Sequence, residues 1–142
     1  MQAPTLRDVY RAKKTIAPHI PRTPLHYSSG LSEMLDSEVY LKHDEHLPLG
    51  AFKGRGGINL LANLSDEEKD RGLITASSGN HGQSMASACK LFGVKAIIGL
   101  PVDANPNKVA AMRALGAELV FHGADFDAAR LHCETLAKEE GY

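Results

Sequence analysis

Two short, glycine-rich clusters hold the side chains best suited to chemistry. Residues 49–57 read LGAFKGRGG and place Lys53 between glycines. Residues 76–83 read ASSGNHGQ, and four of their polar side chains offer hydrogen-bonding groups near the start of a helix: Ser77, Ser78, Asn80 and His81. A lysine amine can attack a carbonyl carbon, and hydroxyl, amide and imidazole groups can hydrogen-bond a carboxylate or a phosphate. The sequence therefore indicates a nucleophile and an anion-binding loop.

The residues around Lys53 favour a functional lysine over a solvated surface lysine. Glycines on both sides would let the backbone approach a ligand closely, and Phe52 supplies an aromatic face beside the amine. A lysine shielded from water becomes a nucleophile that forms a Schiff base with a carbonyl compound. A solvated surface lysine is the alternative, and the spacing alone leaves both interpretations open.

The second cluster is placed where an α/β fold binds anions. It lies between a strand expected at residues 73–76 and a helix expected to begin near Asn80. Loops at the carboxyl ends of parallel strands face the ligand crevice, and a helix N-terminus presents free N–H groups there. The alternative is structural, with Ser78 or Asn80 only capping the helix.

Alternating strand and helix patterns predict the fold that positions these clusters. Strands are expected at residues 73–76, 96–100 and 118–121, each followed by a helical stripe that ends at a glycine. Right-handed crossovers then give a parallel sheet, so we predict a three-layer α/β domain from about Gly50 onwards.

The first 49 residues are not expected to be part of this α/β domain. They contain two helical stripes, an extended proline-rich connector and one strand near residues 39–42 with no neighbouring strand to pair with. The chain stops at Tyr142, after a helix-ending glycine, where another strand would follow. We therefore expect a fragment of a larger protein, with apolar surface exposed around residues 31–41.

Composition excludes several classes of function. The chain has 142 residues, with 16 Lys and Arg against 17 Asp and Glu, so its formal charge of −1 argues against a nucleic-acid binder or a polybasic membrane anchor. No apolar run approaches the roughly 20 residues of a membrane span, and no signal peptide is recognisable. The cysteines, Cys89 and Cys133, have no metal spacing, which favours free core thiols and a cytoplasmic location.

Other motifs fail in their details. No P-loop is present, and Ala76 stands where a GxSxG elbow around Ser78 would need glycine. His43 and His46 flank two acidic residues, but we interpret this segment as a solvated loop rather than a metal site. No metal is predicted.

Three segments together resemble the serine/threonine dehydratase and serine racemase family of pyridoxal-phosphate enzymes. They are residues 22–25 (RTPL), 50–56 (GAFKGRG) and 77–83 (SSGNHGQ). The resemblance implies a tryptophan-synthase β-like fold, in which a small domain is inserted into a large one. Residues 1–49 would be an incomplete N-terminal piece of the large, cofactor domain, and residues 50–142 the small α/β domain.

The resemblance also implies roles for the site residues. Lys53 would hold pyridoxal 5′-phosphate as a Schiff base and then act as the base at the substrate α-carbon, with Phe52 packed beside the cofactor ring. Asn80 would hydrogen-bond the cofactor's phenolic oxygen. The substrate carboxylate would be bound by a set of three residues: Ser77, Asn80 and His81. Ser78 matches the residue that serves racemases as second acid/base and faces the opposite side of the substrate.

The implied reaction is the conversion of L-threonine, L-serine or a related β-hydroxy amino acid to a 2-oxo acid and ammonia. A serine or hydroxyaspartate racemase of the same family is one alternative, and a non-catalytic amino-acid-binding or anion-binding half-protein is another. The full-length protein would be a homo-oligomer.

The chain departs from the family pattern in two ways. Leu49 and Ala51 replace the usual threonine and serine, which removes two polar contacts and leaves the choice of substrate open. The family's phosphate-binding loop, pyridine-nitrogen partner and metal site would lie beyond Tyr142. We therefore expect this chain alone not to turn over substrate.

Overall fold

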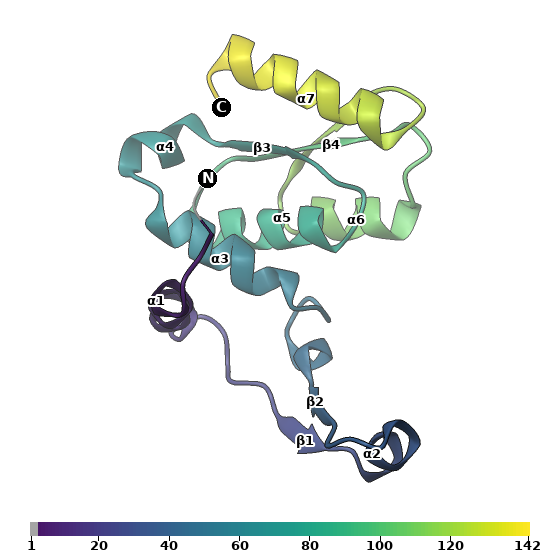
Figure 1. The fold of residues 1–142 in the computed structure, drawn as a ribbon. Coiled ribbons are helices and arrows are strands. Elements are labelled where there is room, and N and C mark those ends of the chain that lie inside the picture. The colour runs from purple at the N-terminus through teal and green to yellow at the C-terminus, as the bar shows by residue number, and fades with distance from the viewer. Residues whose placement is uncertain (1–2) are drawn as a thin grey trace.

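The computed structural model, which describes residues 3–142, contains a three-stranded parallel sheet (Figure 1). The strand order is β3 (Leu73–Ala76), β4 (Ala96–Leu100) and β5 (Glu118–Phe121). Their registers pair Thr75 with Ile98 and Ile98 with Leu119. The parallel sheet and its three strands are those predicted from the sequence.

Helices cover both faces of this sheet. The helices of this part of the chain are α3 (Lys53–Asn63), α4 (Asp66–Arg71), α5 (Asn80–Phe92), α6 (Pro106–Ala114) and α7 (Phe126–Glu140), of which α5, α6 and α7 pack on the strands. In Figure 1, α7 lies on one face and α5 with α6 on the other, while α3 packs on the outer side of α5. The predicted three-layer α/β architecture is confirmed.

Local sequence signals account for these elements. All five residues of β4 are buried, as expected for a continuous apolar strand covered on both sides. Asn105 accepts backbone hydrogen bonds at the start of α6, and Gly93 ends α5 with φ +69°. Cys89 and Cys133 are free and buried, as predicted. On α3, Leu61 is fully buried, whereas Leu60 is 44% exposed.

The N-terminal unit, residues 3–49, lies outside the parallel sheet. It contains α1 (Leu6–Ile16), β1 (Leu25–Tyr27), α2 (Ser29–Leu35), β2 (Tyr40–Lys42) and a 3₁₀ turn, Asp44–His46. The expectation that the strand near residue 40 has no partner is wrong, because β1 pairs with it antiparallel, Tyr27 opposite Tyr40. The extended connector expected at residues 19–25 ends one residue earlier in the structure, because Leu25 already belongs to β1.

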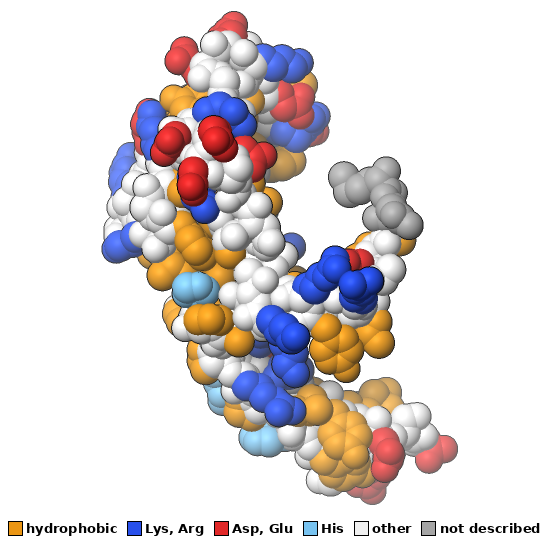
Figure 2. Space-filling model, turned by 90° about the vertical axis from the view of Figure 1, so that its left-hand side faces the viewer, with side chains coloured by type: hydrophobic (Ala, Val, Ile, Leu, Met, Phe, Trp, Pro, Cys, Tyr) orange, Lys and Arg blue, Asp and Glu red, His pale blue; other side chains and the backbone are white. Residues whose placement is uncertain are grey.

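Apolar side chains are exposed on this N-terminal unit. Figure 2 shows them at the end of the molecule where Figure 1 places β1, α2 and β2. Met34 is 77% exposed, Leu35 60% and Tyr40 53%, in agreement with the predicted exposure of residues 31–41. Among the residues described, no helix is long and apolar enough to cross a membrane.

Candidate functional site

The packing of α3 on α5 brings the two glycine-rich clusters together. The hydroxyl of Ser84, a buried residue of α5, donates a hydrogen bond of 2.6 Å to the backbone oxygen of Lys53. The close approach occurs at Gly57, where a Cβ atom would lie 2.6 Å from Ser84 Oγ and 2.8 Å from Ser84 O. Lys53 is the first residue of α3, and its backbone is therefore hydrogen-bonded to the second turn of α5, the helix that begins within the SSGNHGQ segment.

The Lys53 side chain is exposed and its amine is unpaired. Its Nζ atom lies 5.1 Å from the centre of the Phe52 ring, and no hydrogen bond or ion pair joins it to another residue in the described range 3–142. Phe52 is itself 60% exposed. The amine can therefore react with an incoming carbonyl compound, with an aromatic face beside it.

Ser77 organises the loop at the start of α5. Its side chain is buried, and its Oγ accepts hydrogen bonds from the backbone N–H groups of Gly79, at 3.3 Å, and Gly82, at 3.0 Å. The structural alternative considered above named Ser78 or Asn80 as the cap, but the N-cap residue of α5 is Gly79, and the side chain that accepts the hydrogen bonds is that of Ser77. Because a hydroxyl has two acceptor sites and one proton, the Ser77 O–H can still donate to a ligand.

The other three loop side chains are exposed. Asn80 Oδ1 accepts a hydrogen bond of 2.9 Å from Lys108 Nζ, and His81 Nε2 lies 3.4 Å from Thr75 Oγ1. Since lysine only donates, Lys108 orients the Asn80 amide so that its NH₂ group faces away as a donor. The Ser78 side chain has no hydrogen-bond partner among the residues described.

The backbone of the loop adds further donors. No described residue accepts a hydrogen bond from the N–H groups of Asn80 and His81 in the first turn of α5. A Cβ atom at Gly79 would meet nothing within 4 Å, so the space above this turn is open. Unpaired N–H groups and the positive end of the helix dipole favour a bound anion. The arrangement suits the carboxylate of an amino acid.

A second network connects the RTPL segment to the lysine segment. Arg55 donates to both carboxylate oxygens of Asp44, at 3.0 and 2.8 Å, and Thr23 donates to Asp44 Oδ1 at 2.6 Å. Lys42 Nζ donates to Thr23 O at 2.6 Å. The hydrogen bonds from Arg55 are the main reason that the pKa of Asp44 falls to about 2. Asp44 thus fixes the start of α3 against the N-terminal unit.

This network makes a pH-dependent contribution to stability. Because the pKa of Asp44 is lower in the folded protein, the stabilisation is complete above about pH 4 and is lost as the pH falls towards 2. We expect it to amount to at most about 2 kcal/mol. Urea unfolding between pH 2 and 5 should show a weaker pH dependence for Asp44→Asn than for the wild type. Asp66, whose side chain is 95% exposed, provides the control. If Asp66→Asn weakened the pH dependence of unfolding as much as Asp44→Asn, the assignment to Asp44 would be wrong.

The Ser84 hydrogen bond can be tested by itself. Ser84→Ala removes a buried donor to the Lys53 backbone and should lower the free energy of unfolding by about 1 kcal/mol. Ser87→Ala is the matched control, because Ser87 lies on the same helix and its side chain makes no hydrogen bond to any described residue. Urea titration measures both changes. Equal free energies of unfolding for the two variants would show that the hydrogen bond from Ser84 does not stabilise the fold.

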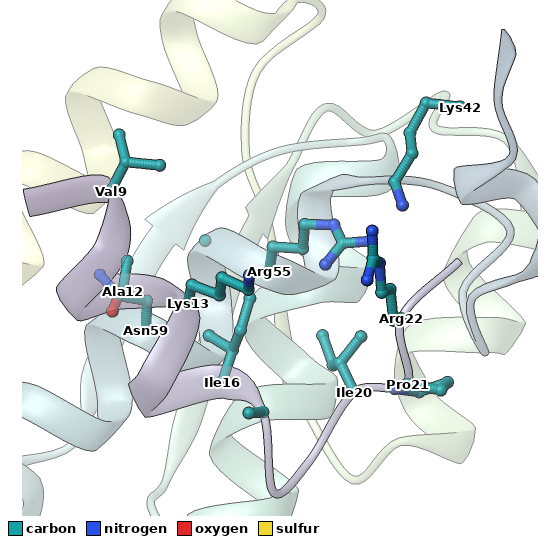
Figure 3. A pocket seen from close by; sticks show the side chains of 12 residues that line it. Val9, Ala12, Lys13, Ile16, Ile20, Pro21, Arg22, Lys42, Arg55 and Asn59 are labelled. Atoms are coloured by element: carbon teal, nitrogen blue, oxygen red, sulfur yellow. The ribbon is translucent and has the colours of Figure 1, made fainter. Parts of the chain in front are cut away.

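A pocket lies elsewhere, between α1 and α3. It measures about 750 Å³ and is lined by apolar residues such as Ile16 and Ile20. Figure 3 shows Arg22, Lys42 and Arg55 gathered at one end of it. Neither Lys53 nor the loop at the start of α5 lines it, so it is distinct from the candidate site.

Sequence reasoning named the lysine and the loop but missed three residues that position them. Ser84 holds the Lys53 backbone, Lys108 orients Asn80, and Asp44 pairs with Arg55. Lys108 follows the helix-starting Asn105 by one turn, which is the signal that could have placed it at this edge of the sheet. Ser84 gave no signal, because its partner is distant in the sequence.

The site thus combines a free lysine amine with a loop at the carboxyl end of a parallel strand. The amine can react with a carbonyl cofactor, and the loop can bind an anionic substrate. Residues 16–142 match the family described as pyridoxal-phosphate dependent enzymes. The chain therefore belongs to this family, whose cofactor is pyridoxal phosphate. Its fold is the tryptophan-synthase β-like fold predicted above.

Individual relatives agree with this assignment. The chain is 43% identical over 125 residues to an L-threonine ammonia-lyase of Thermotoga maritima, covering 88% of this chain and 31% of that protein. It is 41% identical over 138 residues to a catabolic L-threonine dehydratase of Staphylococcus aureus, covering 96% of this chain and 40% of that protein. The structure of maize serine racemase superposes with a TM-score of 0.90 at 31% identity, covering 99% of this chain and 43% of that one. The chain thus spans less than half the length of each.

Proposed function

We propose that this chain is the lysine-bearing and substrate-binding portion of a pyridoxal-phosphate-dependent dehydratase, an ammonia-lyase for L-threonine, L-serine or a related β-hydroxy amino acid. The observation that carries the proposal is the hydrogen bond from Ser84 to the Lys53 backbone, which holds a lysine with an unpaired amine against the second turn of α5. The names of the two threonine-cleaving relatives support the substrate class.

The residues present fit the cofactor. Lys53 is the attachment point, because its amine is exposed and has no competing partner in the described chain, and Phe52 offers a face for the pyridine ring. Pyridoxal phosphate, when bound, supplies the electron sink that makes the substrate α-proton acidic. The Lys53 amine then removes that proton as general base.

The loop binds and orients the substrate. Its carboxylate accepts hydrogen bonds from the first-turn N–H groups of α5 and from a set of three side chains: Ser77, Asn80 and His81. The Asn80 NH₂ group, left free by the hydrogen bond from Lys108 to Asn80 Oδ1, would donate to the cofactor's phenolic oxygen. Holding the carboxylate fixes the α-carbon in position for proton removal by Lys53.

The wider assignments follow from the same proposal. Residues 1–49 form the first part of the large domain and residues 50–142 the small one. The complete protein works as a cytoplasmic homo-oligomer. The exposed apolar side chains of β1, α2 and β2 support the first point, since they require a covering partner.

The proposal is tested by mapping the cofactor. The chain is incubated with pyridoxal phosphate, reduced with borohydride and digested, and the modified lysine is identified by peptide mass spectrometry. We expect modification of Lys53 above all other lysines. Modification scattered over the exposed lysines in proportion to their reactivity would contradict a preorganised site.

A racemase is the second candidate, because Ser78 is exposed and its side chain has no hydrogen-bond partner among the residues described. A second acid/base on the opposite face of the substrate needs such a group, and maize serine racemase has a closely similar fold. Racemisation of L-serine by the complete protein that disappears in Ser78→Ala, while ammonia release persists, would favour this candidate. Amino-acid binding that survives Lys53→Ala would instead favour a non-catalytic binding protein.

A further inference from the structure

We propose that His43, Glu45 and His46 form a binding site for a divalent transition metal ion, with Zn²⁺ as the best-matched ion. The sequence favoured a solvated loop for this segment, and Glu45 and His46 are indeed exposed, but the structure also brings three potential metal ligands together there. One ligand atom from each residue lies within 4.8 Å of the other two, the only such group of three found in residues 3–142. This site shares no residue with the lysine site and does not depend on the proposed function.

The backbone turn brings the three side chains together. The 3₁₀ turn Asp44–His46 is closed by a hydrogen bond of 3.3 Å from His46 N to His43 O. In a 3₁₀ turn, side chains three residues apart lie on the same side. The rings of His43 and His46 accordingly lie 5.4 Å apart at an interplanar angle of 22°.

Asp44 fixes this turn without occupying the site. Its carboxylate is bound by Arg55 and Thr23, so it faces away from the two histidines. His43 is also held in place, because its side chain is only 21% exposed and its ring lies 4.8 Å from that of His26. Two of the restraints that a metal site needs, a fixed turn and a fixed first ligand, are therefore present before any ion binds.

The orientation of His43 presents one nitrogen to the site. Its Nδ1 lies 2.5 Å from Glu45 Oε1. Its Nε2 is buried and has no hydrogen-bond partner among the described residues, so it is the nitrogen turned away from solvent. Nδ1 is therefore the metal-facing atom of this ring.

The distances suit a small ion after modest side-chain rotation. His46 Nε2 lies 3.9 Å from Glu45 Oε1, and His43 Nδ1 lies 2.5 Å from the same atom. Tetrahedral Zn²⁺ with bonds of about 2.0–2.2 Å needs ligand atoms roughly 3.3 Å apart, which lies between these two values. Glu45 and His46 are 59% and 58% exposed, so both can adjust and a water molecule can fill the fourth position.

The ligand types select the class of ion. Two imidazoles and one carboxylate match Zn²⁺ and its transition-metal neighbours, whereas Ca²⁺ and Mg²⁺ prefer oxygen ligands throughout. The donors must be deprotonated to bind, so protons compete with the metal. We expect binding of one ion per chain near neutral pH and weaker binding on acidification.

The test is a titration of the cofactor-free chain with Zn²⁺ by calorimetry, and with Co²⁺ by visible absorption. We expect one saturable site. Loss of an outer-shell partner alone weakens metal sites roughly 10- to 100-fold, so His46→Ala and Glu45→Gln should each weaken binding at least tenfold. Both side chains are largely exposed, and circular dichroism checks that the variants fold.

The chain offers a matched control in a second histidine pair. His122 and His132 stack at 4.1 Å and 17°, but no third ligand joins them in the described structure. His132→Ala should leave binding unchanged. The proposal is overturned if wild-type binding is not saturable, if His132→Ala weakens binding as much as His46→Ala, or if the chain unfolded in urea binds as tightly as the folded chain.

Discussion

Replacing Lys53 by alanine is expected to abolish the borohydride-fixed incorporation of pyridoxal phosphate. Lys53 has an unpaired, exposed amine, and its backbone is held by a hydrogen bond from Ser84 of α5. No other described lysine has both features. The side chain of Lys53 makes no hydrogen bond within residues 3–142, so its removal should change the free energy of unfolding by no more than about 0.5 kcal/mol. Loss of incorporation with unchanged stability would separate a chemical role from a structural one.

The matched control for this prediction is Lys90→Ala. Lys90 is exposed and lies at the far end of α5, away from the loop. Incorporation per chain, measured by intact-protein mass after reduction, should match the wild type in this variant. Undiminished labelling of Lys53→Ala would mean that pyridoxal phosphate reacts with surface lysines, and the proposed site would be wrong.

Replacing Gly57 by alanine is expected to cause the largest loss of stability of any single methyl addition in α3. The added Cβ would lie 2.6 Å from Ser84 Oγ and 2.8 Å from Ser84 O. The second contact is with backbone, which cannot rotate away, so α3 must separate from α5. Overpacking of this kind costs about 1–3 kcal/mol and occasionally more, which exceeds the gain of up to about 1 kcal/mol in helix propensity.

Gly56→Ala provides the opposite expectation in the same helix. Gly56 is exposed, and its Cβ would meet nothing within 4 Å. Only the gain in helix propensity remains, so this variant should be more stable than the wild type by up to about 1 kcal/mol. Urea titration of both variants gives the comparison. Equal stabilities would show that α3 and α5 are not in the close contact described above.

Gly57→Ala should also disturb the lysine site, because the separation of the helices breaks the hydrogen bond from Ser84 to the Lys53 backbone. Labelling of Lys53 by pyridoxal phosphate and borohydride should become slower in Gly57→Ala and remain unchanged in Gly56→Ala. Altered stability without any change in labelling would mean that the position of Lys53 does not depend on α5.

Much of the α/β domain could be predicted because its signals are local. The capping box of Ser65 and Glu68, the cap at Asn105 and the terminal glycine at Gly93 each act within one helical turn, and all are present in the structure. The continuous apolar run of β4 requires cover on both faces wherever it is placed. Such features depend on neighbours in the sequence, which a reader of the sequence can see.

The N-terminal unit was less predictable because its strands are short and their partners distant. Leu25 and Lys42 pair across an intervening helix, and three-residue strands carry almost no alternation to read. The turn after β2 shows the same limit. Nothing in the letters HDEH tells which acidic side chain turns inward, and the structure shows that Asp44 is bound by Arg55 while Glu45 faces the histidines.

The sequence by itself determined the residue types of the candidate site: a lysine among glycines, and a loop of hydroxyl, amide and imidazole groups before a helix. Only the tertiary structure decided how they are used. It brought Ser84 to the Lys53 backbone, turned the Ser77 hydroxyl towards the backbone N–H groups of the loop and set Lys108 against Asn80. The physical reason is range. Caps and turns form between residues a few positions apart, whereas a hydrogen bond between Ser84 and Lys53 exists only because two helices pack closely enough to leave room for no side chain at Gly57.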